Sequence, residues 1–145
     1  MEENYILSVC GRQTVGESSD KIELQAPASY VQRGSSRYIT YKEYDPQNPE
    51  KHYRTTVRID ENNVVTVTKG GEENHHLILE KGRRHKCEYN TPFGSIMMGV
   101  YTDMVNVDLD EHGGSLTVHY SIDIDAELAS SNELTITVRE TPAEK

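Results

Sequence analysis

The residues of this chain best suited to chemistry are its histidines and cysteines, and the most suggestive spacing is that of His85 and Cys87. Side chains two apart in a strand lie on one face, so the imidazole could activate the thiol as a nucleophile. No third group in the sequence is placed to orient the histidine. We adopt the alternative, a small interior thiol beside an interior histidine, and predict no catalytic residue and no enzymatic activity.

The six histidines also raise the question of a metal site. His75 and His76 are adjacent, so in a strand they point to opposite faces and do not chelate together. No Cys and His have the spacing of a zinc finger, and His52, His112 and His119 fall in or near loops or on a polar face. The sequence therefore predicts no metal and no cofactor.

Two further features are of the kind that binds anions. Gly70-Gly71 and Gly113-Gly114 are typical of hairpin turns, and neither opens a helix whose N-terminus could hold a phosphate. Arg83-Arg84 and Lys86 form a small basic patch that could bind an anion. Such a cluster beside a turn is more often a solvated surface, which is the interpretation we adopt.

Composition excludes several classes of partner. The formal net charge of −9 argues against nucleic acid or an anionic membrane, since both require a basic face. No apolar run approaches the ~20 residues needed to cross a bilayer. The acidic, polar opening of the sequence is unlike a signal peptide, and the chain has two cysteines. We predict a cytoplasmic protein with reduced thiols.

Apolar and polar residues alternate along almost the whole chain, which is typical of strands with one buried and one exposed face. Turn residues interrupt the alternation at roughly 8–14-residue spacing, and no helical period is present. Eleven segments alternate in this way, and we expect about ten strands from them: 4–14, 22–30, 37–44, 53–60, 63–69, 76–80, 85–90, 95–101, 105–110, 115–128 and 134–138.

A meander of this length is expected to curl into an antiparallel barrel, because closure removes the exposed edges of the sheet. Two irregularities are predicted within it. Pro27 cannot donate to a ladder, which places its strand at an edge or at a bulge. The run Ser115–Leu128 would extend beyond ~40 Å, so it should bend near Asp123–Asp125.

The turn at Lys81-Gly82 decides which side chains of the next strand face inward. A two-residue loop would bury a row of charged side chains. A loop one residue longer, with Gly82 in the left-handed conformation, pairs Leu79 with His85 and Glu80 with Arg84. We therefore expect Cys87 and Tyr89 to be buried, and Arg84 and Lys86 to be exposed.

Several short motifs follow one another in the second half of the chain, namely Thr91-Pro92-Phe93-Gly94, Met98-Gly99, the acidic segment Val105–Asp110, Gly113-Gly114 and Ser131–Thr135. Their order and spacing resemble the YwiB-like family of small bacterial proteins, and the resemblance covers nearly the whole chain. It implies a calycin-like barrel. It implies no activity, because the family is uncharacterised.

Together, the alternation and the resemblance predict an all-β protein. We expect a single domain over residues 1–140 that forms an antiparallel up-and-down calycin (lipocalin-like) β-barrel of eight to ten strands, and a flexible tail over 141–145. The ligand motifs of other calycins are missing: the chain has no Trp for a Gly-x-Trp, and Arg139 is not followed by the Tyr of an Arg-x-Tyr.

The barrel interior is the remaining candidate site. Barrels of eight or more strands can hold a small ligand, and polar groups converging in an apolar concavity are the default site hypothesis. We predict a non-enzymatic binding module for a small apolar or amphipathic molecule. The alternative is a filled barrel that acts as a protein–protein interaction module. The predicted ligand-binding residues are the inward-facing Tyr53, Thr55, His85, Tyr89 and Tyr120.

Overall fold

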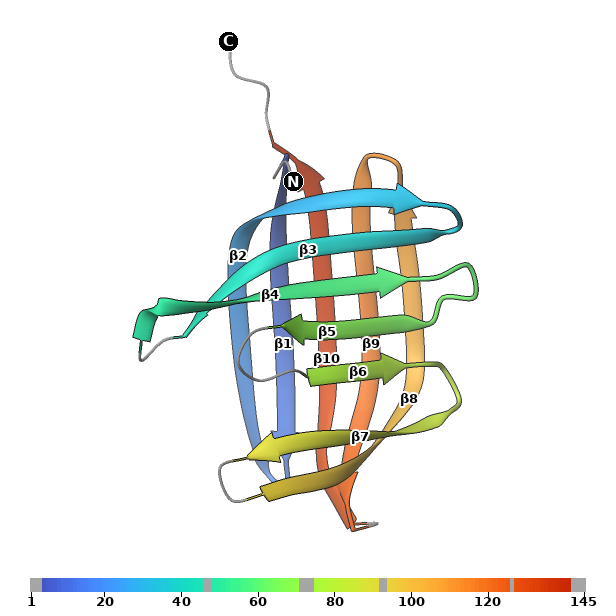
Figure 1. Ribbon diagram of the computed structural model, residues 1–145. Helices are drawn as coiled ribbons and strands as arrows, with labels where there is room; N and C mark the ends of the chain where they lie inside the picture. The colour runs from blue at the N-terminus through green and yellow to red at the C-terminus, as the bar shows by residue number, and fades with distance from the viewer. Residues whose placement is uncertain (1–3, 46–47, 71–74, 92–93, 126, 142–145) are drawn as a thin grey trace.

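The computed structural model describes residues 4–45, 48–70, 75–91, 94–125 and 127–141. Within these residues the chain forms ten β-strands and no helix (Figure 1). The strands are β1 (Tyr5–Val15), β2 (Ser18–Arg33), β3 (Ser36–Asp45), β4 (Asn48–Ile59), β5 (Val65–Gly70), β6 (His75–Leu79), β7 (Arg84–Thr91), β8 (Gly94–Asp110), β9 (Gly113–Ile124) and β10 (Glu127–Glu140).

All these strands belong to one sheet, in the order β6-β5-β4-β3-β2-β1-β10-β9-β8-β7. Every ladder between neighbours is antiparallel, and β1 pairs with β10. The sheet therefore curls into a nearly closed barrel whose two edges, β6 and β7, follow one another in the chain. The predicted antiparallel up-and-down β-barrel of eight to ten strands is confirmed, and its architecture is calycin-like.

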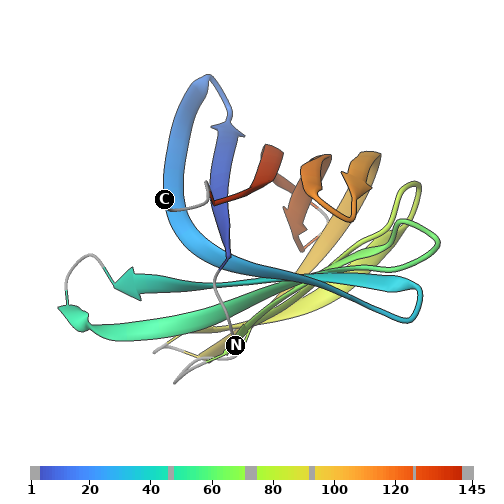
Figure 2. The ribbon, with the colours of Figure 1, turned by 90° about the horizontal axis from the view of Figure 1, so that it is seen from above.

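The barrel is flattened into two layers whose strands cross at a large angle (Figures 1 and 2). Strands β3 to β7 form the front layer of Figure 1, and β1, β10 and β9 form the back layer. The two longest strands turn the corners between the layers. Strand β2 pairs with β1 over Ser18–Ala28 and with β3 over Ala28–Arg33. Strand β8 pairs with β7 over Gly94–Tyr101 and with β9 over Met98–Asp110.

Alternation along each strand places every second side chain inside the barrel. Buried side chains from both layers meet there and form one core cluster, each burial removing apolar surface worth roughly 1.5–3 kcal/mol for a large aliphatic side chain. The cluster consists of Leu7, Ala28, Tyr30, Ile39, Tyr41, Val57, Ile59, Val65, Leu79, Val100, Leu116, Val118, Ile136 and Val138.

Polar contacts join the two layers at the end of the barrel where β8 ends. We call this the upper end, after its place in Figure 1. The Tyr30 hydroxyl donates to the Asp110 carbonyl oxygen at 2.6 Å, and Arg37 Nη1 donates to the same oxygen at 3.0 Å. The ring of Tyr5 meets that of Tyr30 edge to face, with centroids 5.3 Å apart. These contacts join β1, β2 and β3 to the end of β8 and close the upper end.

Strands β6 and β7 do not pair, although turn chemistry predicts a hairpin here. Among the described residues no ladder joins them. The turn has the expected form, because the Arg83 N–H donates to the Glu80 carbonyl at 3.0 Å and Gly82 has a φ of 79°. However, the Gly82 N–H donates to the Thr102 carbonyl at 2.7 Å, which holds the chain on β8 and away from β6. The predicted ladder pairs are therefore wrong, namely Leu79 with His85 and Glu80 with Arg84.

The predicted faces of β7 agree with the structure more closely. The side chains of Arg84 and Lys86 are exposed, and Cys87 packs against the core cluster. Cys87 is half-buried rather than fully buried. The side chain of Tyr89 lies outside the part of the chain that the structure describes.

The expected break after Tyr101 is absent, and β8 continues to Asp110. The ladder with β9 shifts register between Thr102 and Met104, which leaves Asp103 as an extra, bulged residue. A bulge reverses the parity of the inward-facing positions. This explains why the inward-facing residues of β8 have even numbers before Asp103 and odd numbers after it.

The long run Ser115–Leu128 is two strands instead of one. The chain reverses at Asp125, whose φ is 53°, and continues into β10. A second register shift lies between Leu128 and Ser130. Residues 130–132, between the predicted strand segments 115–128 and 134–138, lie within β10. The predicted irregularity near Asp123–Asp125 is therefore a complete turn.

Candidate functional site

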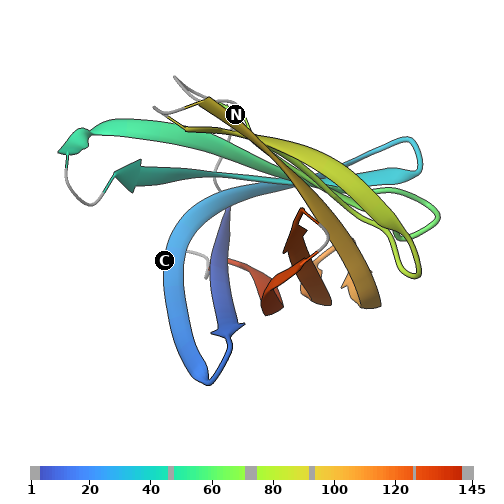
Figure 3. The same cartoon turned by 90° about the horizontal axis from the view of Figure 1, so that it is seen from below.

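The barrel is open at the end opposite the upper end. We call the inner surface at this open end the lower mouth. It is formed by the inward-facing residues Ile96, Met98, Thr102, Tyr120, Ile124 and Asn132. The ladder registers place Met98 opposite Ile124 and place Tyr120 between Thr102 and Asn132. Figure 3, seen from below, shows the β1–β2 hairpin diverging from the front layer on this side.

Two of the three apolar residues of the lower mouth, Ile96 and Ile124, are exposed although they face inward, and Met98 is half-buried. Ile96 is 39% exposed and Ile124 is 36% exposed, whereas Val100 and Val118, on the same faces of β8 and β9, are fully buried. Ile22, on the inner face of β2, is 66% exposed. An inward-facing residue becomes exposed only where the opposite layer does not cover it. The lower mouth is therefore an apolar surface open to solvent.

A row of polar side chains forms the inner boundary of the lower mouth. The Thr102 hydroxyl is fully buried and has no hydrogen-bond partner among the described residues. Burial raises the pKa of Tyr120, so its hydroxyl stays protonated and can donate a hydrogen bond. Asn132 Nδ2 donates to Ser130 Oγ at 3.1 Å and to the Tyr120 carbonyl at 3.5 Å. Beneath the apolar residues of the lower mouth, the row thus holds a buried hydroxyl with no partner among the described residues.

His85 and Cys87 lie at the edge between β6 and β7, next to the lower mouth. His85 Nε2 lies 2.9 Å from Glu80 Oε1, and Cys87 Sγ donates to the His76 carbonyl at 2.9 Å. Burial raises the pKa of the Cys87 thiol, which keeps it protonated. The imidazole and the thiol therefore contact other groups and do not contact each other in a nucleophile–base arrangement.

Tyr53 and Thr55 lie on β4 in the front layer and belong to a different cluster. Glu43 stands at its centre: Glu43 Oε1 accepts from the Tyr41 hydroxyl and Oε2 accepts from Thr55 Oγ1, both at 3.2 Å. Lys69 Nζ lies 3.2 Å from the same Oε2. Tyr53 is half-buried opposite Glu43. The hydroxyls of Tyr41 and Thr55 are thus already bonded within the protein.

The five predicted ligand-binding residues therefore do not form one cluster. Tyr120 lies in the lower mouth, His85 lies beside it, and the backbone of Tyr89 pairs with that of Ile96. Sequence reasoning missed Thr102 and Asn132 in the lower mouth. Both fall within segments that lack clear alternation because of the two bulges, so their inward orientation leaves no simple sequence signal.

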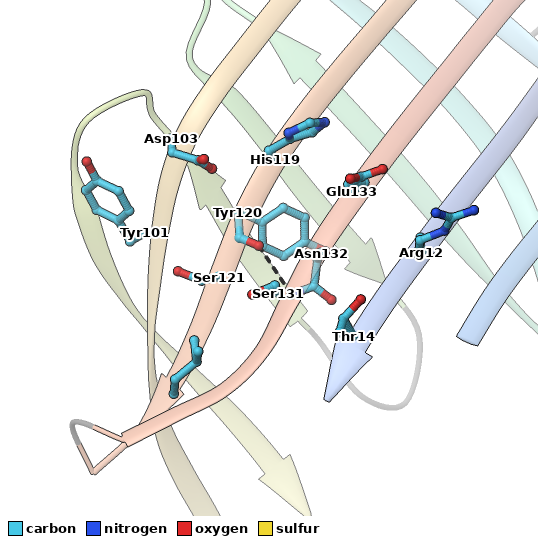
Figure 4. Close-up of a pocket in the computed structure, with 11 residues that line it drawn as sticks. Arg12, Thr14, Tyr101, Asp103, His119, Tyr120, Ser121, Ser131, Asn132 and Glu133 are labelled. Carbon is cyan, nitrogen blue, oxygen red and sulfur yellow. Dashed lines mark hydrogen bonds between the residues drawn. The ribbon is translucent and has the colours of Figure 1, made fainter. Parts of the chain in front are cut away.

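A second concavity lies on the outer face of the same strands (Figure 4). It has a volume of about 400 Å³. Its charged residues lie across adjacent strands, with Arg12 opposite Glu133 and Glu133 opposite His119, while Asp103 is the bulged residue of β8. Arg12 contributes a positive charge to it, and Glu133 and Asp103 contribute negative charges. Within the described residues no three His, Cys, Asp or Glu side chains gather closely enough to hold a metal ion.

Comparison with known proteins gives a family and a fold. A protein-family model described as "Domain of unknown function (DUF1934)" matches residues 7–136. The solved structure described as "Crystal structure of ywiB protein from Bacillus subtilis" is similar, with a TM-score of 0.82 and 20% identity over 95% of this chain and 92% of that chain. No curated protein matches. None of the described residues forms a helix that could span a membrane.

Proposed function

This chain belongs to the DUF1934 family, and we propose that it is a non-enzymatic binding protein that holds a small amphipathic molecule in the lower mouth of its barrel. The carrying observation is the Thr102 hydroxyl, which is fully buried without a partner among the described residues. Leaving a buried polar group unpaired costs roughly 1–3 kcal/mol, and a ligand that supplies an acceptor recovers it.

The side chains near Thr102 favour a ligand whose remaining part is apolar. Ile96, Met98 and Ile124 offer an exposed apolar wall on the same inner face. A molecule with an apolar body and one polar end would cover these side chains. Because the Thr102 side chain is fully buried in the unliganded protein, side chains around it must move for the polar end to reach its hydroxyl. A mostly apolar surface with few polar groups is the kind of lining that small-molecule sites have.

We propose no catalytic step because the nucleophile candidate nearest the lower mouth, the Cys87 thiol, is not activated. The Cys87 thiol is held protonated by burial, which raises its pKa, and it donates to a backbone carbonyl. A protonated thiol is a poor nucleophile. Thiol alkylation near neutral pH tests this point: slow labelling of Cys87 is expected, and rapid labelling would restore the nucleophile hypothesis.

Native mass spectrometry of the protein purified from its own cells is the first test of binding. A co-purifying small molecule is the expected result. A bare protein mass would favour the alternative function, a filled barrel that acts as a protein–protein interaction module. The observation that favours this alternative is the core cluster, whose side chains from both layers fill the barrel above the lower mouth.

A fluorescent amphiphile, dansyl-labelled undecanoic acid, tests the location. Ile96→Gln places an amide in the apolar wall, and we expect roughly tenfold weaker binding of the amphiphile. Met97→Gln is the matched control, because Met97 is the next residue, faces outward and is 56% exposed. Equal losses in the two variants would place binding of this amphiphile elsewhere on the protein.

A further inference from the structure

The lower half of β2 has a free edge. Strand β2 pairs with β1 over Ser18–Ala28, but it pairs with β3 only from Ala28 onward. Among the described residues nothing pairs with the other side of Ser18–Pro27, and we call this side the β2 free edge. An exposed edge presents unpaired backbone groups that can accept another strand.

The ladder with β1 shows which residues point their backbone groups to this edge. Val15 and Ser18 close a two-residue hairpin loop, so they form a hydrogen-bonded pair. Bonded and non-bonded pairs alternate along an antiparallel ladder, so the even-numbered residues of β2 bond to β1. Pro27, opposite Ile6, is odd-numbered, so its nitrogen points away from β1. A proline suits this position because it has no N–H to donate to β1. The N–H and C=O groups of Ser19, Lys21, Glu23 and Gln25 therefore point to the free edge.

We propose that the β2 free edge pairs antiparallel with the same edge of a second copy of this chain, around a two-fold axis at Ile22. A symmetric pairing must join odd-numbered residues to odd-numbered residues, because these residues carry the free backbone groups. With the axis at Ile22, Lys21 lies opposite Glu23 of the second copy, and Ser19 lies opposite Gln25 of the second copy.

Charge selects this register among the possible ones. An axis at Lys21 would place two lysines directly opposite each other, and an axis at Glu23 would do the same with two glutamates; like charges directly opposite destabilise a sheet. An axis at Leu24 would place Lys21 opposite Pro27, which cannot donate. The axis at Ile22 instead gives two reciprocal Lys21–Glu23 contacts. Within one chain these two side chains already approach to 2.8 Å between Nζ and Oε1, and both are more than half exposed.

The same register covers the most exposed inward-facing residue of β2. Ile22 is 66% exposed, and its neighbour on β1 is Gly11, which has no side chain to cover it. In the proposed dimer Ile22 meets Ile22 of the second copy in a non-hydrogen-bonded pair, where opposite side chains are closest. The pairing therefore continues the back layer across the axis and buries an apolar side chain that the monomer leaves in solvent.

Sedimentation equilibrium with charge-reversed variants tests the proposal. The wild-type protein is expected to dimerise reversibly with rising concentration. The variant K21E places two glutamates opposite each other across the axis, and E23K places two lysines opposite each other, so each variant alone should dimerise roughly tenfold more weakly. Mixing K21E with E23K should restore association as a one-to-one heterodimer, because both opposite pairs across the axis then join a glutamate to a lysine, whereas each homodimer has two like-charge pairs.

The control is Lys42→Glu, which changes the net charge as K21E does but lies on β3, a strand paired on both sides. This variant is expected to dimerise like the wild type. A wild-type protein that stays monomeric, or a mixture of K21E and E23K that does not associate, would overturn the proposal. Dimerisation unaffected by K21E would place the interface elsewhere and overturn it equally.

Discussion

The two ends of the barrel share strand β8 but differ in how their polar groups are paired. At the upper end the Asp110 carbonyl accepts from both Tyr30 and Arg37, which ties the two layers together. At the lower mouth the Thr102 hydroxyl is buried without a partner among the described residues, and inward-facing isoleucines are exposed. The side chains of the upper end stabilise the fold, and the lower mouth keeps groups that a ligand could use.

This difference predicts that the upper end contributes more to the free energy of unfolding, and that the lower mouth is the better candidate for binding. Well-packed, fully hydrogen-bonded regions contribute most to the free energy of unfolding, whereas unsatisfied buried polar groups lower it and exposed apolar residues contribute little. Substitutions at the two ends should therefore have opposite or very unequal effects on stability.

The largest effect is expected in the core of the upper half. Leu116 on β9 is fully buried, so Leu116→Ala should lower the free energy of unfolding by about 2–5 kcal/mol through lost burial and a residual cavity. The counterpart is Ile124→Ala in the lower mouth, where the side chain is partly in solvent and we expect a loss of roughly 1 kcal/mol or less. Urea denaturation measures both, and equal losses would show that the lower mouth is packed like the core.

The hydrogen bonds at the upper end should contribute less to the free energy of unfolding than the core does. Tyr30→Phe removes the hydroxyl that donates to Asp110 and should lower the free energy of unfolding by about 1 kcal/mol. Tyr44→Phe is the control, since Tyr44 is 61% exposed, and no change is expected. If Tyr30→Phe were as neutral as this control in urea denaturation, the Tyr30 hydroxyl would not stabilise the upper end, and ring packing and the Arg37–Asp110 hydrogen bond would account for its closure.

The unpaired hydroxyl at the lower mouth predicts a change of the opposite sign. Thr102→Val replaces the hydroxyl by a methyl group of similar size, and we expect the free energy of unfolding to rise by up to about 1 kcal/mol. Thr55→Val is the matched control: Thr55 is equally buried, but its hydroxyl donates to Glu43, so this change should destabilise. Thr102→Val should also weaken binding of the dansyl amphiphile. A destabilised Thr102→Val variant would reveal a partner for this hydroxyl within the apo protein.

The smallest effect concerns pH at the upper end. His112 Nδ1 lies 2.7 Å from Glu140 Oε1, and this carboxylate raises the pKa of His112 above its usual value of 6.5. The charged pair therefore stabilises the fold fully below about pH 6.5, and this contribution is lost as pH rises through the folded-state pKa. We expect His112→Gln to lower the melting temperature slightly at about pH 5.5 and to leave it unchanged at about pH 8.5. The same difference at both values would exclude an ionic contribution.

Much of the fold could be predicted from the sequence because it depends on local chemistry. Alternating side chains predict strands and their buried faces, and Gly82 takes the left-handed conformation that the turn requires. The candidate site was less predictable. Tyr120 was identified from clean alternation in β9, but Thr102 and Asn132 were not, since each follows or precedes a bulge that hides its orientation.

The sequence by itself determined that this chain is all-β, that its strands run antiparallel, and that Arg84 and Lys86 face solvent, because each of these follows from side-chain period and turn residues. Only the tertiary structure decided that β6 and β7 stay unpaired, that the upper end closes and that the lower mouth remains open. Those outcomes depend on contacts between residues far apart in the chain. The Gly82 N–H donates to the Thr102 carbonyl of β8, and the Tyr30 hydroxyl donates to the Asp110 carbonyl across the barrel. No local sequence pattern encodes either hydrogen bond.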